Sequence, residues 1–473
     1  MPDFDVAILG GGPAGYVAAI RGAQLGGRVC VIEPENLGGT CVTWGCIPTK
    51  TLIASAHVLQ MARRAKEFGV IIDGTVRPDF PAMMARKDRV VDGLVKGVEG
   101  LFKSHGVTRI RGRGRLTGPG RLKIDKVSPK EDGPGDVTAG KIIVATGSRP
   151  AQFPAFPSDG KHILTSDDAM RLKNLPKSFL IIGAGIIGCE FAFLLRTLGC
   201  EITMVEMLSR ALPTEDEDIS KILERELKKE KIKLLVNERI EKVDVRGGGV
   251  VARLRGGDKI KAEKALVSIG RAFNTDEIGL ETVGVALAKN QSIAADSKME
   301  TNVPGIYVAG DVAGGKLLAH KGSAEGIVAV SNALGVEKEM NYLAVPAGIF
   351  THPEVGSVGL TEAQAREGDR PVKVGRFLYR AMGKSHATGE LVGEVKIVAD
   401  ERTGEIMGAH IIGESAADLI HEVTLAMRWE LTVEELAETI HVHPTISETI
   451  MEAAHAVQGM SPHQPKAAGT PAA

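Results

Sequence analysis

The feature that most constrains the fold of this chain is a strand–loop–helix–strand unit that occurs twice. In the first copy, an apolar run at residues 4–9 leads into a glycine-rich loop at residues 10–15. A helical stretch follows as far as Leu25, and a second predicted strand at residues 28–32 ends in Glu33. Short, continuously apolar runs are typical of buried parallel strands. This order of elements is the fingerprint of a dinucleotide-binding fold.

Three glycines of this loop have different roles in such a fold. They are Gly10, Gly12 and Gly15, with Pro13 and Ala14 between the last two. The first glycine permits a tight turn, the second lets backbone N–H groups approach a pyrophosphate, and the third allows close packing of helix on strand. Glu33 is placed to accept hydrogen bonds from the hydroxyl pair of a ribose. The sequence therefore predicts a first dinucleotide site.

The second copy repeats these parts in the same order. An apolar run at residues 179–182 precedes a loop at residues 183–188, a helix reaching Leu198, and a strand at residues 201–205 that is followed by Glu206. The loop glycines are Gly183, Gly185 and Gly188. From the first glycine to the acid the spacing is 23 residues in both copies (33 − 10 and 206 − 183). This repetition predicts two dinucleotide sites and disfavours one site accompanied by a chance glycine-rich turn.

A cysteine pair lies just after the first copy. Cys41 and Cys46 are five positions apart, and such a pair beside a redox cofactor can alternate between dithiol and disulfide, passing two electrons each time. Pro48 suits the first turn of a helix, which places Cys46 at the positive end, where a thiolate is stabilised. Lys50 follows one turn later and adds a positive charge. Two unreactive cysteines in a tight turn are the disfavoured alternative.

The position of this pair assigns the cofactors. The first site should hold the flavin dinucleotide FAD beside the thiols, and the second should hold an exchanging nicotinamide. Glu206 favours NAD, because a carboxylate there accepts from the 2′-hydroxyl of NAD and repels the 2′-phosphate of NADP. Residues 207–209 offer no basic replacement, and Arg210 is poorly placed by sequence distance.

Composition excludes several classes of function. Glycine accounts for 57 of 473 residues, as expected of a protein with several phosphate-binding turns, and the length predicts about three domains. The net charge of −1 argues against nucleic acid or an anionic membrane as partner. Without a leader or an apolar membrane span, the chain is expected in the cytoplasm, where a disulfide is catalytic rather than structural. Cys30, Cys189 and Cys200 are expected to be inert core residues, and no metal site is expected.

These motifs resemble those of the flavin-dependent pyridine nucleotide-disulfide oxidoreductases. The resemblance covers residues 3–458 and includes the cysteine segment, both fingerprints and a C-terminal segment from His441 to Glu448. The chain is most similar to the members that oxidise dihydrolipoyl groups with NAD. The resemblance therefore implies a homodimer whose partner is a lipoyl-bearing acyltransferase or carrier protein of a 2-oxoacid dehydrogenase or glycine cleavage system.

Four shorter stretches add to the resemblance. Residues 145–148 and 268–271 resemble the two crossovers between the flavin and nicotinamide domains, residues 305–311 resemble the strand whose aspartate holds the flavin ribityl chain, and residues 318–320 resemble the segment packed on the flavin ring. Further residues implied at the flavin site are Gly39, Thr40, Lys50, Gly114, Thr146, Gly147, Asp311, Leu318 and Ala319. Those implied at the nicotinamide site are Ile187, Ile240, Gly270 and Arg271.

The resemblance also implies the remaining catalytic groups. His443 precedes a proline, and Glu448 about one turn into the next helix can orient the imidazole as a base. In the family this histidine comes from the partner subunit, whereas His410, His421 and His441 stay unassigned. Lys50 is expected near the reacting nitrogen of the flavin, paired with Glu190.

The expected fold class is α/β, with two Rossmann-like domains and a C-terminal α+β dimerisation domain. The motifs place the flavin domain at residues 1–148 and 274–344, the nicotinamide domain at 149–273, the dimerisation domain at 345–459 and a disordered tail at 460–473.

The substrate is less constrained than the chemistry. Residues 42–44 differ from the small and amide residues usual between the cysteines, and Trp44 is expected to reshape the pocket beside the disulfide. The alternatives are a related flavin disulfide reductase with another thiol or disulfide substrate, and a non-catalytic flavoprotein subunit of an acyltransferase complex.

Overall fold

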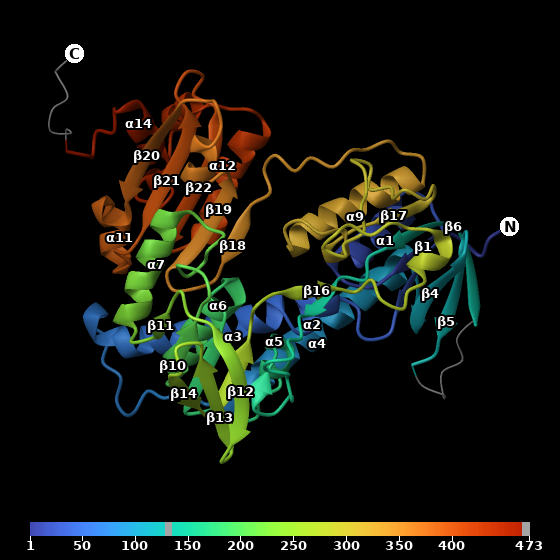
Figure 1. Ribbon diagram of the computed structural model, residues 1–473. Helices are drawn as coiled ribbons and strands as arrows, with labels where there is room; N and C mark the ends of the chain where they lie inside the picture. The colour runs from blue at the N-terminus through green and yellow to red at the C-terminus, as the bar shows by residue number, and fades with distance from the viewer. Residues whose placement is uncertain (128–134, 466–473) are drawn as a thin grey trace. The chain divides into compact units, whose positions relative to one another are not determined.

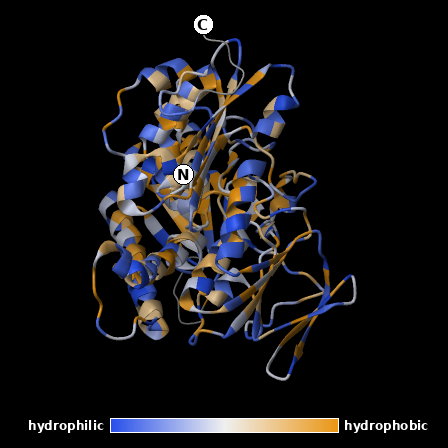
Figure 2. Ribbon diagram, turned by 90° about the vertical axis from the view of Figure 1, so that its left-hand side faces the viewer, coloured by the Kyte–Doolittle hydropathy of each residue, from blue (hydrophilic) through white to orange (hydrophobic). Residues whose placement is uncertain are grey.

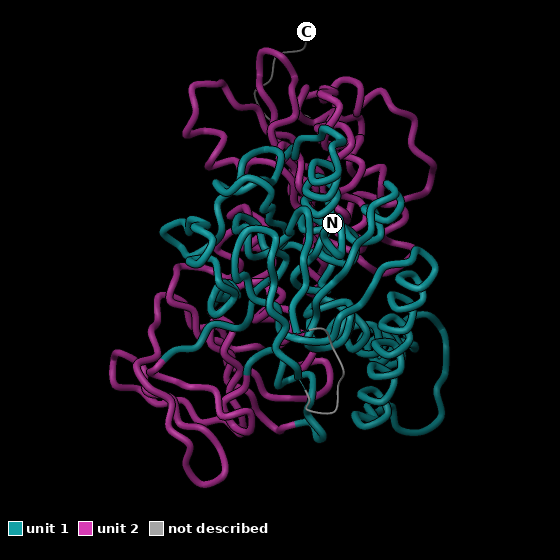
Figure 3. The backbone as a smooth tube through the Cα atoms, turned by 90° about the vertical axis from the view of Figure 1, so that its right-hand side faces the viewer, with its two compact units in different colours: residues 1–153, 165–175, 270–341 teal, residues 154–164, 176–269, 342–473 magenta. Residues whose placement is uncertain are grey.

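The computed structural model describes residues 1–127 and 135–465, and they form two compact units (Figure 3). The first unit comprises residues 1–153, 165–175 and 270–341, and the second comprises residues 154–164, 176–269 and 342–473. The first unit contains the first fingerprint and the cysteine pair. The second contains the other fingerprint and the C-terminal histidine motif. The finer division predicted from the motifs remains a proposal.

The first unit is built on a sheet whose central strands are parallel (Figure 1). The strand order is β3-β2-β1-β6-β5-β4, with β17 beside β6, and β4 and β5 run antiparallel to their neighbours. These strands are β1 (Phe4–Leu9), β2 (Val29–Glu33), β3 (Thr108–Arg111), β4 (Arg113–Gly118), β5 (Arg121–Asp125), β6 (Asp136–Val144) and β17 (Ile306–Val308). Because β1 and β2 are parallel, the loop after β1 and the acid that ends β2 lie at the same edge of the sheet.

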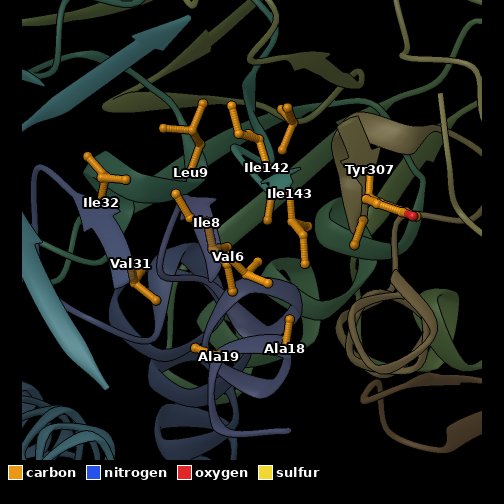
Figure 4. Packing of buried hydrophobic residues seen from close by; sticks show 14 of the residues in the cluster. Val6, Ile8, Leu9, Ala18, Ala19, Val31, Ile32, Ile142, Ile143 and Tyr307 are labelled. Atoms are coloured by element: carbon orange, nitrogen blue, oxygen red, sulfur yellow. The ribbon is translucent and has the colours of Figure 1, made fainter. Parts of the chain in front are cut away.

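Two helices from distant parts of the chain cover this sheet side by side. Helix α1 (Pro13–Gln24) follows the first loop, and α9 (Ala319–Ala333) packs against it (Figure 1). Val6 and Ile8 of β1 are fully buried in the core that includes Ala18 of α1 (Figure 4). The unit also contains α2 (Gly39–Thr43), α3 (Cys46–Arg64), α4 (Phe80–His105), α5 (Ser166–Ala169), α8 (Leu280–Val283) and the strand pair β7 (Ser148–Pro150) and β16 (Arg271–Phe273).

The second unit contains another parallel sheet around the second fingerprint. Its order is β11-β10-β9-β15-β8, so the second loop and Glu206 again share one edge. The strands are β8 (Ile163–Leu164), β9 (Ser178–Ile182), β10 (Glu201–Val205), β11 (Lys233–Leu235) and β15 (Lys264–Val267). Helix α6 (Ile186–Leu198) follows the loop, and α7 (Glu217–Lys229) precedes β11. A separate antiparallel sheet consists of β12 (Ile240–Arg246), β13 (Gly249–Leu254) and β14 (Lys259–Ala262).

The C-terminal part of the second unit is an antiparallel sheet covered by helices. Its order is β18-β19-β22-β21-β20. The strands are β18 (Ala347–Ile349), β19 (Glu354–Gly359), β20 (Val372–Leu378), β21 (Glu394–Asp400) and β22 (Ile406–Gly413), and the helices are α10 (Glu362–Arg366), α11 (Gly383–Thr388), α12 (Ala416–Arg428), α13 (Val433–Glu438) and α14 (Glu448–Gln458). The helices combine hydrophobic and hydrophilic residues (Figure 2). Helix α14 buries Ile450 and Ala453 against this sheet.

The last described residues contact α14. Composition predicts a disordered tail from residue 460, of which residues 466–473 lie outside the described part of the chain. Ser461 Oγ donates to Glu452 Oε2 at 2.6 Å, and His463 Nδ1 lies 2.6 Å from Glu452 Oε1. The Glu452 side chain is buried, so these contacts satisfy a carboxylate that faces the protein interior.

Candidate active site and cofactor loops

The first and third glycines of each loop are required by the packing of the protein itself. A Cβ atom on Gly10, whose φ is +103°, would lie 2.3 Å from the carbonyl oxygen of Ala145. One on Gly15 would lie 1.9 Å from the carbonyl oxygen of Gly10. The second loop repeats this, with 2.6 Å between a Cβ on Gly183 and Ser268 O, and 2.1 Å between one on Gly188 and Gly183 O.

The middle glycines are surrounded by open space instead. A Cβ on Gly12 would meet only the Cα of Gly39, at 3.9 Å, among the described residues. One on Gly185 would have no described heavy atom within 4 Å. Both residues cap the N-terminus of their helix, α1 or α6, where unpaired N–H groups favour an anion. This open space at two helix N-termini fits a pyrophosphate in each loop.

Glu33, which ends β2, and Glu206, which follows β10, each accept a hydrogen bond from the adjacent glycine-rich loop. Glu33 Oε2 accepts from the N–H of Gly11 at 2.7 Å, and Glu206 Oε2 accepts from the N–H of Ala184 at 2.7 Å. In each carboxylate, Oε1 accepts from the N–H two residues further along the chain. Because a carboxylate has about four acceptor positions, capacity for ribose hydroxyls remains. The sequence predicted the ribose contact and missed this role in holding the loop.

The two cysteines of the predicted pair lie within hydrogen-bonding reach of each other. Cys41 lies on α2, and Cys46 is the first residue of α3, as Pro48 indicates. A hydrogen bond with the Cys46 side chain, together with burial, raises the pKa of the Cys41 thiol, whereas the charge of Lys50 lowers it. Burial and this hydrogen bond therefore disfavour a thiolate at Cys41, whereas Cys46 lies at a helix N-terminus, a position where a thiolate is stabilised.

The other three cysteines are fully buried and unreactive. Burial raises the pKa of Cys30 to about 12, and burial raises the pKa of Cys200 to about 12 as well. Cys189 lies on α6, and burial raises the pKa of its thiol too. Cys30 lies on β2, whereas Cys200 lies in the connection between α6 and β10 rather than inside an element. These positions agree with the expected inert role of the three buried thiols, and exchange at Cys41 and Cys46 remains a prediction.

The segments that resemble the crossovers meet beside Asp311. Ser148 Oγ donates to Asp311 Oδ2 at 2.5 Å, and Arg271 Nε donates to Ser148 Oγ at 2.7 Å. Thr146 and Asn274 are joined by two hydrogen bonds, Thr146 Oγ1 to Asn274 O at 2.7 Å and Asn274 Nδ2 to Thr146 O at 2.8 Å. Asn274 was not expected from the sequence, because its partner lies 128 residues earlier.

A buried ion pair fixes the turn that carries Asp311. Lys321 and Glu325 of α9 are 3% and 1% exposed, and Lys321 Nζ lies 2.7 Å from Glu325 Oε1. Glu325 Oε2 accepts from the N–H of Gly310 at 2.8 Å, and Lys321 Nζ donates to the carbonyl oxygen of Gly314 at 2.9 Å. The pair therefore contacts the chain on both sides of Asp311. Leu318 and Ala319, also expected at the flavin site, are the N-cap and first residue of α9.

The histidine motif is arranged as its spacing indicates. His443 Nδ1 lies 2.9 Å from Glu448 Oε1, and the His443 side chain is 76% exposed. Glu448 is the first residue of α14 rather than a turn inside it. Burial opposes ionisation of Glu448, but the N–H of Thr445 and the His443 ring outweigh it and lower the pKa of this carboxyl group. An ionised Glu448 fixes the imidazole ring and leaves Nε2 exposed.

A second histidine–carboxylate pair lies near this motif. His441 Nε2 is 2.6 Å from Glu422 Oε1, and its Nδ1 is 2.7 Å from the carbonyl oxygen of Thr439. The hydrogen bond to Glu422 raises the pKa of His441 despite burial. The His441 side chain is only 5% exposed, so both nitrogens are used within the protein. This pair has a structural rather than a catalytic arrangement.

The other predicted residues of the second loop lie within the second unit. Glu190 on α6 is buried, and its Oε1 accepts from the N–H of Phe350 at 2.9 Å. Ile187 lies in the first turn of α6, and Ile240 is the first residue of β12. The pairing of Glu190 with Lys50 remains a prediction.

Met207, the residue that follows Glu206, lines an open pocket of about 420 Å³. Its lining includes Met207, Glu238, Arg239 and Arg255. The sequence did not predict the two arginines here, because they are separated from the loop by tens of residues. Arg210, the basic residue nearest to Glu206 in the sequence, donates to the carbonyl oxygens of Pro213 and Glu215 instead.

Two of the predicted glycines, Gly114 and Gly270, lie on or directly before strands of the first unit. Gly114 on β4 packs so closely that a Cβ would lie 2.4 Å from Leu9 Cδ2. Gly270, with φ of +127°, directly precedes β16. Gly39 and Thr40 are the first residues of α2, and Gly147 precedes β7.

Comparisons with known proteins agree with this geometry. The family model described as pyridine nucleotide-disulphide oxidoreductase matches residues 4–331, and the dimerisation domain of the same family matches residues 345–454. Among curated relatives, the dihydrolipoyl dehydrogenase of Rhizobium etli is 41% identical (95% of this chain, 97% of the relative), and that of Bacillus subtilis is 42% identical (98% and 99%).

Solved structures give the same result. LpdA from Mycobacterium tuberculosis has a TM-score of 0.89 and 32% identity, covering 95% of this chain and 98% of that one. The HOCl-induced flavoprotein disulfide reductase RclA from Escherichia coli has a TM-score of 0.84 and 25% identity, covering 95% and 99%. No helix within residues 1–127 and 135–465 is both long enough and apolar enough to cross a membrane.

Proposed function

Because this chain belongs to the pyridine nucleotide-disulphide oxidoreductase family, we propose that it oxidises dihydrolipoyl groups to lipoyl groups through the Cys41–Cys46 pair. It is an oxidoreductase that uses FAD and NAD, and its expected α/β fold, enzyme class and cofactors are confirmed. Its dimerisation domain supports a homodimer. The observation that carries the reaction is the cysteine pair, with Cys46 at the start of α3 and Cys41 hydrogen-bonded to it.

The proposed reaction begins with the pair as a disulfide. His443 of the partner subunit removes a proton from one substrate thiol, and Glu448 holds its ring by the other nitrogen. The substrate thiolate attacks the sulfur of Cys41, and Cys46 leaves as a thiolate stabilised by the N-terminus of α3. The second substrate thiol then displaces Cys41, which takes up a proton. Two electrons and two protons have passed from the substrate to the protein.

The cofactors complete the cycle. When bound, FAD would supply the two-electron chemistry that links the Cys41–Cys46 dithiol to hydride transfer with NAD. The first loop, Asp311 and Lys50 would hold the flavin, and the second loop with Glu206 would hold NAD. Glu190 is proposed to pair with Lys50. The open space at Gly12 and Gly185 supports a pyrophosphate in each loop.

The proposed partner is a lipoyl-bearing acyltransferase or carrier protein of a 2-oxoacid dehydrogenase or glycine cleavage system. A cytoplasmic location is proposed as well, because the pair must exchange between dithiol and disulfide and three further thiols are kept free. The flavin domain is proposed at residues 1–148 and 274–344, the nicotinamide domain at 149–273 and the dimerisation domain at 345–459.

A steady-state comparison tests the substrate. The forward rate is measured for dihydrolipoamide, reduced glutathione and free dithiols, each with NAD and with NADP. The reverse rate is measured for the corresponding disulfides with NADH and with NADPH. We expect NAD-linked turnover with the lipoyl compound to exceed the others by at least an order of magnitude. Cys46→Ser should abolish it and the long-wavelength absorption band of the partly reduced enzyme, whereas Cys30→Ser should retain both. Stoichiometric FAD without lipoamide turnover would favour a non-catalytic subunit.

A further inference from the structure

Trp44 forms the joint between the two helices that carry the exchanging cysteines. Helix α2 carries Cys41 and ends at Thr43 with Trp44 as its C-cap, and α3 begins at Cys46. The N–H groups of Trp44 and Gly45 both donate to the carbonyl oxygen of Thr40, at 2.9 and 2.6 Å. Because only Trp44 and Gly45 separate the two helices, the conformation at Trp44 constrains how far apart the two sulfur atoms can lie.

A cation from a distant segment lies on the face of the Trp44 ring. The guanidinium carbon of Arg171 is 4.0 Å from the ring centroid. Cation–π attraction acts within about 6 Å, and a planar guanidinium stacks on an indole better than an ammonium group does. Arg171 is 127 positions from Trp44 in the sequence (171 − 44). The contact therefore links Trp44 to a segment that is distant from it in the sequence.

The segment that carries Arg171 is itself fixed. Thr165 and Asp168 form a capping box at the start of α5, and the N–H of Arg171 donates to the carbonyl oxygen of Asp168 at 3.0 Å. Lys87 of α4 is 4% exposed, and its Nζ donates to the carbonyl oxygen of Met170 at 2.8 Å. The segment that carries Arg171 is thus fixed by hydrogen bonds within its own turn and by Lys87 of α4.

We infer that Arg171, held in place by Lys87, is a positioning residue that sets the redox equilibrium of the Cys41–Cys46 pair through the Trp44 ring. The inference rests on the proposed redox role of this pair. Oxidation of the pair by an external disulfide forms one protein S–S bond and transfers two electrons and two protons to that disulfide. The equilibrium of this reaction depends on the effective concentration of one thiol at the other. An ordered connection at Trp44 removes part of the entropy cost of bringing the two thiols together, and therefore favours the disulfide.

The test measures this equilibrium directly in the full-length enzyme with FAD bound. Wild type and Arg171→Met are equilibrated with mixtures of reduced and oxidised dithiothreitol, quenched in acid and alkylated, and the Cys41–Cys46 disulfide is quantified by mass spectrometry. Because Arg171 is an exposed residue, we expect Arg171→Met to shift the equilibrium about two- to fivefold toward the dithiol. A fivefold shift raises the potential by about 20 mV. Arg171→Lys should recover part of the difference.

The chain offers a matched control on another helix. The guanidinium carbon of Arg428, the last residue of α12, lies 5.7 Å from the ring of Trp429. Arg428→Met removes the same type of contact and should leave the thiol equilibrium at the wild-type value. An equal shift in both variants would contradict a specific role of Arg171.

The remaining outcomes separate the inference from the function on which it rests. An Arg171→Met equilibrium identical to that of the wild type overturns the inference while leaving the redox pair intact. If the wild-type pair forms no disulfide at any buffer ratio, the proposed function fails instead. Should Arg171→Met not fold, Lys87→Met provides the same test, because it frees the Met170 carbonyl that anchors the segment. An unchanged equilibrium in that variant also overturns the inference.

Discussion

Replacing the middle glycine of one loop by alanine, as Gly12→Ala or Gly185→Ala, should affect one cofactor site at a time. Gly12 and Gly185 have φ of −70° and −74°, which alanine adopts without strain. A Cβ at Gly12 would be 3.9 Å from Gly39 Cα, and one at Gly185 would meet no described atom within 4 Å. The apoprotein should therefore be no less stable, and by about 0.4–1 kcal/mol more stable, because alanine restricts the unfolded chain.

The cost should fall on cofactor binding alone. The added methyl group occupies the space through which a pyrophosphate reaches the backbone N–H groups, and losing a hydrogen bond to a charged group costs about 1.5–3 kcal/mol. Because each 1.4 kcal/mol is about tenfold in affinity, binding should weaken roughly ten- to a hundredfold. Gly12→Ala should lower flavin retention, and Gly185→Ala should raise KM for NAD with kcat preserved at saturation.

Three measurements decide the outcome. The flavin-to-protein absorbance ratio after gel filtration reports FAD retention, steady-state kinetics report KM for NAD, and urea unfolding of the apoprotein reports stability. Gly15→Ala serves as the contrast, because its Cβ would lie 1.9 Å from Gly10 O and should lower the free energy of unfolding itself. Loss of flavin in Gly185→Ala, or of NAD affinity in Gly12→Ala, would show that the loops hold the opposite cofactors.

Three further changes test other parts of the protein. Glu448→Gln should lower kcat about ten- to a hundredfold with FAD content unchanged, because the ring of His443 loses an anionic partner; an unchanged kcat would exclude this pair from catalysis. Lys321→Met should lower the free energy of unfolding in urea by about 3–5 kcal/mol, since it removes the cation that lies 2.7 Å from the buried Glu325 carboxylate, and a smaller loss in Lys321→Met/Glu325→Leu would support this cause. The raised pKa of His441 stabilises the fold fully below the ordinary value of 6.5 and less as pH rises through the folded value. The unfolding free energy should therefore fall more steeply above pH 6.5 in wild type than in Glu422→Gln, and parallel curves would contradict this.

Local patterns in the sequence were sufficient to locate both loops and the cysteine helix. The predicted strands at residues 4–9 and 201–205 coincide with β1 and β10, because short and mostly apolar runs are typical of buried parallel strands. Cys46 begins α3 as Pro48 indicates, and His443 contacts Glu448. Each of these features depends on residues within a few positions of one another.

Features that depend on strand register or on distant partners were not predictable. The contact of Glu33 with the Gly11 N–H spans 22 residues and exists because β1 and β2 are adjacent and parallel. Lys396 lies in β21, where a charged residue is usually solvent-facing, yet its side chain is 2% exposed and its Nζ is 2.7 Å from both Asp216 and Asp218. These carboxylates precede it by 180 and 178 residues, so no local pattern reveals them.

The attachment of the final described residues to α14 has a practical consequence for handling this protein. Glu452, which accepts from Ser461 and lies against His463, is one helical turn from Glu448, the residue that orients His443. Truncation at residue 459 would remove both partners from the buried Glu452 side chain, which lies on the same helix as Glu448. Affinity tags and fusions are therefore better joined at the N-terminus, where Met1 is fully exposed.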